Sequence, residues 1–164
     1  MRKTVANAVR RCSEAVDRLC LRVAAITLSL MIAIVMLQVV ARYAFHAPPQ
    51  WTEEAGRYLM LWACLMGATV SFKRRMDPVL VVPSAQWRCR LGPLIPGARF
   101  LAVAIFTLPL LWYTPAALAH QYLRDSEMLG LNLALVMVVV PLSLGVVMLH
   151  AALEFFASVL DPGS

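Results

Sequence analysis

The stretch RYAFHAPPQWTEEAGR, residues 42–57, decides the fold because it forms a corner between two long apolar runs. Its two prolines end the preceding helix, since proline lacks a backbone N–H and restricts the residue before it. Thr52 is a typical N-cap residue, and Glu53 and Glu54 would follow it in the first turn of the next helix. Arg57 lies within one helical turn of both acids, so the pattern predicts an ion pair at the entry to that helix.

The composition indicates an integral membrane protein. Of the 164 residues, 61% are hydrophobic and 15% are charged, whereas soluble domains have roughly 45–50% apolar and about 25% charged residues. The net charge of +6 could suggest nucleic acid as a partner. The basic residues cluster beside apolar runs, however, and this favours a role in membrane topology and membrane lipids as the contact.

Four uncharged runs follow one another along the chain and predict an all-α fold with four transmembrane helices in a single membrane domain. The first run, 23–41, nearly matches a hydrocarbon core of roughly 30 Å at about 1.5 Å per residue. Pro109 and Pro115 in the third run predict a kink, and the fourth run contains Pro141. The predicted spans are 21–44, 53–72, 100–122 and 129–155.

Residues 1–20 combine basic side chains with small or apolar residues at three- and four-residue spacing. This periodicity predicts an amphipathic surface helix that lies along an anionic cytoplasmic leaflet. A secretory signal peptide is the alternative. The segment is long and partly acidic, and no A-x-A-like cleavage site follows, so we expect it to remain uncleaved.

The distribution of Lys and Arg predicts the orientation. The N-terminal segment and the basic loop 73–99 hold twelve of these residues, whereas the other two connections hold three. By the positive-inside rule, both termini are cytoplasmic in a multi-pass inner-membrane protein. The twelve are Arg2, Lys3, Arg10, Arg11, Arg18, Arg22, Lys73, Arg74, Arg75, Arg88, Arg90 and Arg99; the three are Arg42, Arg57 and Arg124.

Small residues recur every four positions in the first two predicted spans. Such patterns let two helix backbones approach closely, so we expect these faces to pack on each other. They are Ala25, Ser29 and Ala33 in the first span and Ala63, Gly67 and Ser71 in the second.

Several other function classes are not supported by the residues present. The four cysteines form no C-x-x-C pair, so neither zinc nor a redox dithiol is indicated. A haem anchor would need two facing intramembrane histidines, but His120 and His150 are expected roughly 30 Å apart along the membrane normal. A multidrug exporter would need a carboxylate inside a span, and the first predicted span has none. No combination of nucleophile, base and acid indicates an enzyme. We expect no cofactor and no metal.

The corner and the helix after it carry a specific motif. It consists of Arg42-Tyr43-x-Phe45, then Trp51-Thr52-Glu53-Glu54-x-x-Arg57, Trp62 and Gly67-Ala68 before a basic cluster. This pattern resembles the DctQ-like small membrane subunit of tripartite ATP-independent periplasmic (TRAP) transporters. The chain departs from that family where Met76-Asp77-Pro78 follows the basic cluster.

The resemblance implies an accessory subunit of a sodium-coupled transporter for organic acids. Its partners would be a large polytopic membrane subunit, whose scaffold it enlarges, and a periplasmic binding protein that it helps to dock. Candidate contact residues are Arg42, Tyr43, Trp51, Glu53, Glu54, Arg57, Trp62 and Gly67.

Each of these residues also has a purely structural interpretation. Glu53, Glu54 and Arg57 could have no role beyond capping a helix and forming an ion pair. Arg42 could extend its side chain to lipid headgroups, and Trp51 and Trp62 could be interface and packing aromatics. The alternative function is a membrane anchor or assembly subunit of another bacterial inner-membrane complex.

Overall fold

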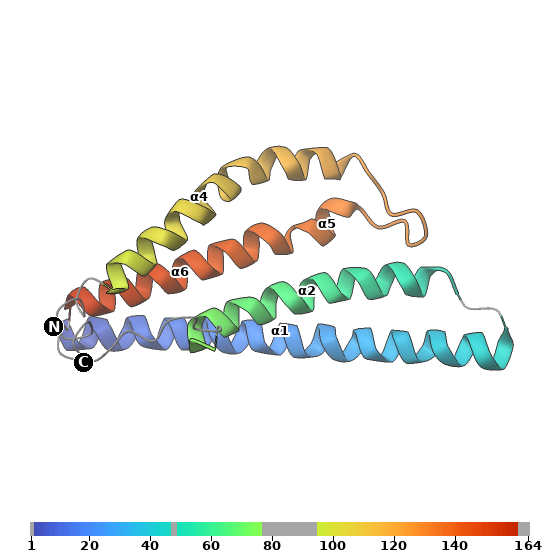
Figure 1. The fold of residues 1–164 in the computed structure, drawn as a ribbon, viewed down its shortest axis with the longest axis horizontal. Coiled ribbons are helices and arrows are strands. Elements are labelled where there is room, and N and C mark those ends of the chain that lie inside the picture. Colours follow the sequence, from blue (N-terminus) through green and yellow to red (C-terminus); the bar gives the residue numbers. More distant parts are fainter. Residues whose placement is uncertain (1, 47–48, 77–94, 161–164) are drawn as a thin grey trace.

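The computed structural model describes residues 2–46, 49–76 and 95–160, and within them it is almost entirely helical (Figure 1). This confirms the predicted all-α class. The helices are α1 (Arg2–Phe45), α2 (Trp51–Arg74), α4 (Ile95–Tyr122), α5 (Leu133–Met137) and α6 (Val139–Leu160). The one β interaction among the described residues is an isolated bridge between Asp125 and Asn132, in the connection between α4 and α5.

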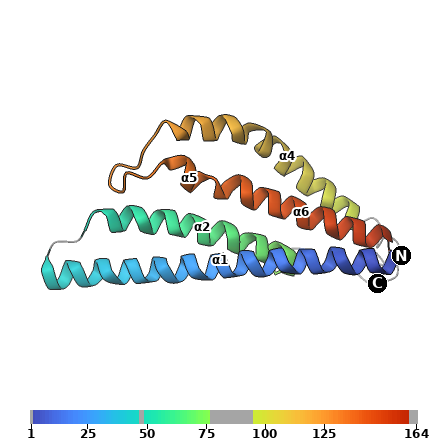
Figure 2. The same ribbon diagram turned by 180° about the vertical axis from the view of Figure 1, so that it is seen from behind.

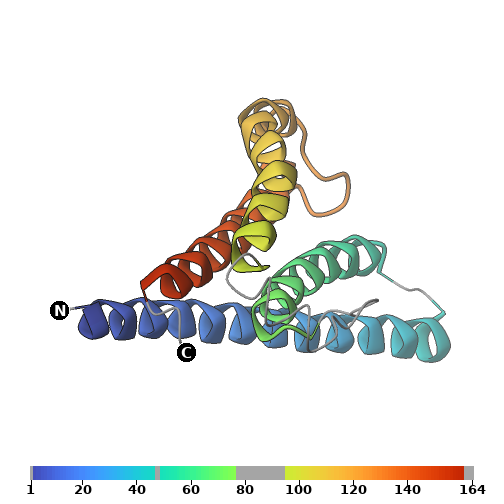
Figure 3. The same cartoon turned by 60° about the vertical axis from the view of Figure 1, so that its left-hand side comes forward.

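The helices form two hairpins that diverge toward one end of the molecule (Figures 1 and 2). α2 lies along α1, and α6 lies along α4 and also contacts α2 and α1. Figure 3 shows α4 and α6 rising away from the α1–α2 pair. The start of α1, the start of α4 and the end of α6 lie at one end, which we call the basic end, and α2 ends toward it, part-way along α1. The hairpin connection 123–132 and the start of α2 lie toward the opposite end, which we call the corner end.

Three helical segments in the described residues are long and apolar enough to cross a membrane, namely Arg11–Phe45, Gly97–Tyr122 and Leu133–Phe156. α2 is not among them. Its charged residues lie in its first two turns and its last turn, so its uncharged part, 58–72, is short. The predicted count of four spans therefore remains a prediction. Residues 77–94 of the predicted basic loop lie outside the described residues.

α1 differs from the prediction because it is one continuous helix. The expected boundary between a surface helix over 1–20 and a span from 21 is absent. The physical reason is local: residues 2–45 contain neither proline nor glycine, so nothing in the backbone ends the helix there. α1 ends instead at Phe45, where His46 adopts a left-handed φ of 54° just before the two prolines.

The residues of α1 that are shielded from solvent recur at three- and four-residue spacing, as in heptad packing. Ala25, Ser29 and Ala33 are all exposed, so the expectation that they pack on α2 was wrong. At 100° per residue they fall on the opposite side of α1 from the shielded stripe. That stripe consists of Cys20, Ala24, Thr27, Met31, Ile34, Gln38 and Ala41. On α2, Ala63 is buried and Gly67 is half-buried.

A small apolar core joins α1, α2 and α6. Met66 is 1% exposed and Val139 is not exposed at all, and both pack with Cys20 and Val70. Trp62 is partly buried against this cluster. The remaining apolar surface of α1 is largely open, as suits a helix whose surroundings are lipid or another membrane protein.

Proline explains why the predicted helix 129–155 is broken. Pro141 has no N–H to offer the carbonyl of Met137, and α5 ends at that residue. The chain continues as α6 from Val139, with Leu142 N–H bonded to the Val138 carbonyl at 3.2 Å. α4 contains Pro109 and Pro115 and stays helical, but it bends along its length in Figure 1, as its prolines predict.

Candidate functional site

Thr52 does not cap α2, which corrects the sequence prediction. The helix begins one residue earlier, with Gln50 at the N-cap position and no side-chain capping bond. The Thr52 hydroxyl is directed back into the corner, where it donates to the Pro49 carbonyl at 2.6 Å. Thr52 is 1% exposed, so this bond satisfies a hydroxyl that the fold has buried.

The predicted ion pair of Arg57 with Glu53 or Glu54 is also absent from the described residues. Glu54 instead accepts a hydrogen bond from the Tyr58 hydroxyl at 2.6 Å and from the backbone N–H of Met128 at 3.0 Å. The second bond connects α2 to the connection between α4 and α5. Glu54 therefore joins the two helical hairpins at the corner end.

The electrostatics of Glu54 follow from these donors. The Tyr58 hydroxyl, with further hydrogen bonds from the Ser126 side chain and from backbone N–H groups, lowers the pKa of Glu54 from its usual 4.5 to about 2. Each donor favours the ionised carboxylate over the neutral acid. Glu54 lies in the first turn of α2, ahead of the uncharged part of that helix.

The connection that reaches Glu54 is a short ordered hairpin. Ser126 N–H donates to the Leu131 carbonyl at 2.8 Å, and Leu133 N–H donates to the Arg124 carbonyl at 3.0 Å. Gly130 has a φ of 61°, a conformation that glycine adopts without strain. Asn132 then caps α5 by accepting from the Ala134 N–H at 2.9 Å.

The other predicted contact residues are not drawn together into one site. Arg42, Glu53 and Arg57 are exposed, Tyr43 is 77% exposed and Trp51 is 38% exposed. Trp62 and Gly67 lie further along α2, partly buried. The first group thus presents free side chains near the corner end, and the last two belong to the packing of α2.

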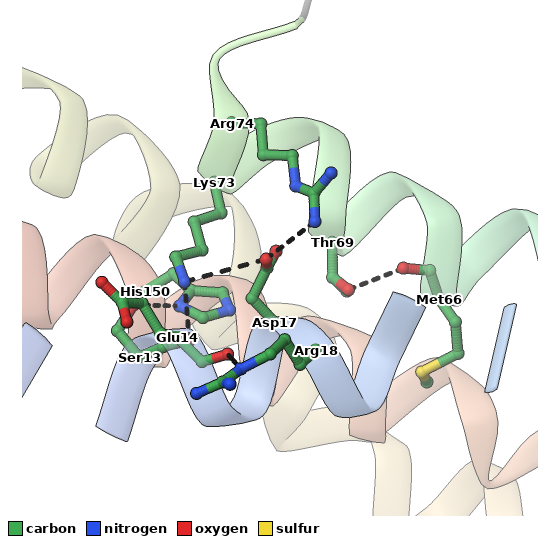
Figure 4. A network of polar contacts seen from close by, with 9 residues as sticks. All are labelled: Ser13, Glu14, Asp17, Arg18, Met66, Thr69, Lys73, Arg74 and His150. Carbon is green, nitrogen blue, oxygen red and sulfur yellow. Dashed lines mark hydrogen bonds and ion pairs between the residues drawn. The ribbon is translucent and has the colours of Figure 1, made fainter. Parts of the chain in front are cut away.

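Sequence reasoning missed a second polar site, at the basic end (Figure 4). Asp17 of α1 is only 7% exposed, and its Oδ2 pairs with Arg74 Nη2 at 3.1 Å and Lys73 Nζ at 4.0 Å. Lys73 also donates to the Ser13 carbonyl at 2.7 Å. The Ser13 hydroxyl lies 3.1 Å from Nδ1 of the buried His150. Asp17 of α1 thereby binds the end of α2, and Ser13, one turn earlier in α1, contacts α6.

Glu154 forms a second ion cluster close by. Its carboxylate pairs with Arg75 through Oε1 and with Arg99 through Oε2, the latter at 3.0 Å. Arg99 also donates to the Phe72 carbonyl at 2.7 Å and lies over the Phe72 ring at 4.2 Å. The guanidinium of Arg99 thus ties the start of α4 to the end of α2 and to α6.

A sequence signal for this site existed. Asp17 lies on the same three- and four-residue spacing as the apolar stripe of α1, and a carboxylate on a buried face requires a cation as partner. Among the described residues, Asp17 Oδ1 and His150 Nε2 have no hydrogen-bond partner. In the described segments, no group of three or more His, Cys, Asp or Glu side chains is arranged to hold a metal.

Chemically, both polar sites hold helices together. They contain donors, acceptors and ion pairs at the two ends of the molecule, whereas the middle of each apolar helix carries no Asp, Glu, Lys or Arg. Such an arrangement suits a protein that stands in a membrane and contacts other molecules at its ends and sides.

Comparison with known proteins agrees with this arrangement. Residues 31–161 match the model of the family described as tripartite ATP-independent periplasmic transporters, DctQ component. A protein of Haemophilus influenzae with the provisional name TRAP transporter small permease protein is 35% identical over 70 residues. That alignment covers 43% of this chain and 41% of the relative.

The family and the apolar helices together indicate a multi-pass protein of the inner membrane. The family match extends over most of the chain, from the middle of α1 to the end of α6. The chain therefore belongs to the DctQ family, the small membrane component of TRAP transporters.

Proposed function

We propose that this small permease subunit is an accessory component with no transport path of its own. It would pack against a large polytopic membrane subunit, enlarge the stationary scaffold of that subunit, and help to dock a periplasmic binding protein. The complete system would move organic acids inward together with sodium ions, as the family resemblance implies.

The observation that carries this proposal is the position of the ionisable groups. A transport site requires polar or charged groups near the bilayer midplane, or broken half-helices in paired repeats. Here the charged contacts of Asp17 and Glu154 lie at the basic end, and those of Glu54 lie at the corner end. The break at Val138 is a single proline effect near one end and has no counterpart in the α1–α2 hairpin.

The orientation with both termini cytoplasmic forms part of the proposal. The start of α1 and the end of α6 share one end of the molecule, and this supports placing both in the same compartment (Figure 1). The excess of Lys and Arg at that end favours the cytoplasm. The corner end, with its exposed Trp51, Glu53 and Arg57, would then face the periplasm, where a binding protein could reach it.

Purification of the tagged chain in mild detergent, followed by mass spectrometry of bound proteins, tests the accessory role. We expect a large polytopic membrane protein in an equal amount. Recovery of a soluble redox enzyme in its place would support the membrane-anchor alternative and contradict the proposal.

The docking role is tested separately with Arg57→Ala, since Arg57 forms no ion pair in the described part of the chain. We expect weaker capture of the binding protein by the membrane complex. Arg124→Ala removes another exposed charge from the same end and serves as the control. Equal capture by wild type and Arg57→Ala would refute a docking role for this residue.

A further inference from the structure

The outward face of α1 at the basic end carries three exposed arginines, namely Arg11, Arg18 and Arg22. Their spacing of seven and four residues places them within about 40° of one another around the helix. The stripe of Ser13, Val16, Asp17 and Cys20 that faces α2 and α6 lies on the opposite side. The arginines therefore point away from the rest of the protein.

Within the described residues, these arginines differ from Lys73, Arg74, Arg75 and Arg99 because no carboxylate forms an ion pair with them. Asp17 is taken by Lys73 and Arg74, and Glu154 by Arg75 and Arg99. Arg18 donates only to the backbone carbonyl of Glu14, at 3.3 Å. Neither Arg11 nor Arg22 has an ion pair or side-chain hydrogen bond within the described residues.

The same face becomes apolar immediately beyond Arg22. Ile26, Met36 and Val40 are 66%, 59% and 56% exposed along it. Leu19 and Leu21, beside the arginines, are 61% and 41% exposed. A row of guanidinium groups at the edge of an open apolar helix face matches the boundary between acyl chains and headgroups, where arginine stems lie on hydrocarbon and their charges reach phosphate.

We propose that Arg11, Arg18 and Arg22 bind the phosphate groups of anionic phospholipids in the leaflet at the basic end. The charges extend over about 16 Å of helix, so they would contact more than one headgroup. The exposed leucines beside them favour lipid over an acidic protein surface. Because α1 is unbroken, the side of a membrane helix makes this contact, in place of a separate surface helix.

Lipid retention tests this assignment. The full chain would be released from nanodiscs of equal parts phosphatidylglycerol and phosphatidylcholine, and bound lipids would be counted by native mass spectrometry. A basic residue near an anionic surface contributes a factor of about five in affinity. Wild type should therefore enrich phosphatidylglycerol at least severalfold, and R11Q/R18Q/R22Q should return the two lipids to a ratio near one.

Two control variants separate binding from misfolding and from net charge. R57Q/R124Q removes two exposed arginines toward the corner end and should keep the enrichment. R11K/R18K/R22K keeps the charges and should restore most of it.

Unchanged enrichment in R11Q/R18Q/R22Q, or none in wild type, would overturn the lipid assignment. Loss of the large membrane subunit from R11Q/R18Q/R22Q, with lipid enrichment intact, would identify this face as a protein contact instead and would also overturn it. Neither result would bear on the accessory role, which the purification experiment tests.

Discussion

Asp17 is the residue on which the polar contact between α1 and α2 depends most at the basic end. It is buried, it pairs with two cations of α2, and the turn that carries it also contacts His150 of α6. Breaking a buried ion pair by removing one partner costs more than the pair contributes, because the other charge is left uncompensated. The energetic importance of this residue exceeds what its place in a basic N-terminal segment suggests.

We expect Asp17→Asn to lower the free energy of unfolding by about 2 kcal/mol. This is less than the value for fully buried pairs because Arg74 is 43% exposed and can be solvated. The measurement is unfolding in mixed micelles of dodecylmaltoside and SDS. Glu14→Gln, an exposed acid one turn away, is the matched control and should have little effect. An equal, small effect of both substitutions would show that the Asp17 cluster adds nothing to stability.

Glu54 makes the stability of the contacts at the corner end depend on pH. Its pKa is lowered from 4.5 to about 2, so its contacts with Tyr58 and Met128 stabilise the fold fully above about pH 4.5. This contribution is lost as the pH falls from 4.5 toward 2. Tyr58→Phe removes the largest cause and should move the Glu54 pKa up toward 4.5.

A carbon-13 NMR titration of the glutamate carboxyl groups, with Glu54→Gln used for assignment, measures this shift. Tyr43→Phe, which alters an exposed tyrosine, should leave the Glu54 pKa unchanged. A Glu54 carboxyl that still titrates near pH 2 in Tyr58→Phe would rule out the hydroxyl as the cause.

The residue contacts show what the sequence could not supply. The motif correctly located the corner between α1 and α2, because prolines between apolar runs act locally. The partner of Glu54 could not be predicted, since it is a backbone N–H 74 positions away that only the folded hairpin brings near. His150 and Ser13, 137 positions apart, pose the same difficulty.

Among the elements, α1 is where sequence interpretation and structure differ most. The change from basic to apolar composition near residue 22 predicts a helix boundary, but a change of composition does not end a helix without a backbone reason. Pro141, by contrast, was a visible backbone reason, and α5 and α6 separate close to it. Helix ends followed proline and left-handed φ values at this scale more closely than they followed charge.

Spin labels at Cys12 and at Met36→Cys, both exposed, test the continuity of α1. The background would have the other cysteines replaced by alanine. For a straight helix of 24 residues we expect a mean separation of about 36 Å. A surface helix set at a right angle near residue 20 would shorten it to about 26 Å. Double electron–electron resonance distinguishes the two, and the shorter distance would contradict a continuous α1.

The 123–132 hairpin is a second element with a conformational requirement of its own. Gly130 has a φ of 61°, so Gly130→Ala should cost about 1 kcal/mol of unfolding free energy. Gly145, within α6, has open space around the position of an added Cβ. Gly145→Ala should therefore be neutral or slightly stabilising. Equal effects of the two substitutions, measured in mixed micelles, would show that the hairpin conformation is not required.

At the scale of the whole molecule, two apolar hairpins are joined by polar contacts at both ends and by a small core between α1, α2 and α6. The long apolar sides of α1 and α4 remain open. In water such surfaces would be a liability, but in a membrane they are available to lipid or to another subunit. This form suits a component that contributes surface to a complex.

The central claim is that this chain assists transport and does not itself transport. Its most direct test is sodium-driven uptake into proteoliposomes, using the ligand that the periplasmic binding protein captures. We predict uptake only when the large membrane subunit, the binding protein and this chain are present together, and none with this chain and the binding protein alone. Uptake by this chain without the large subunit would contradict the account, as would full uptake when this chain is omitted.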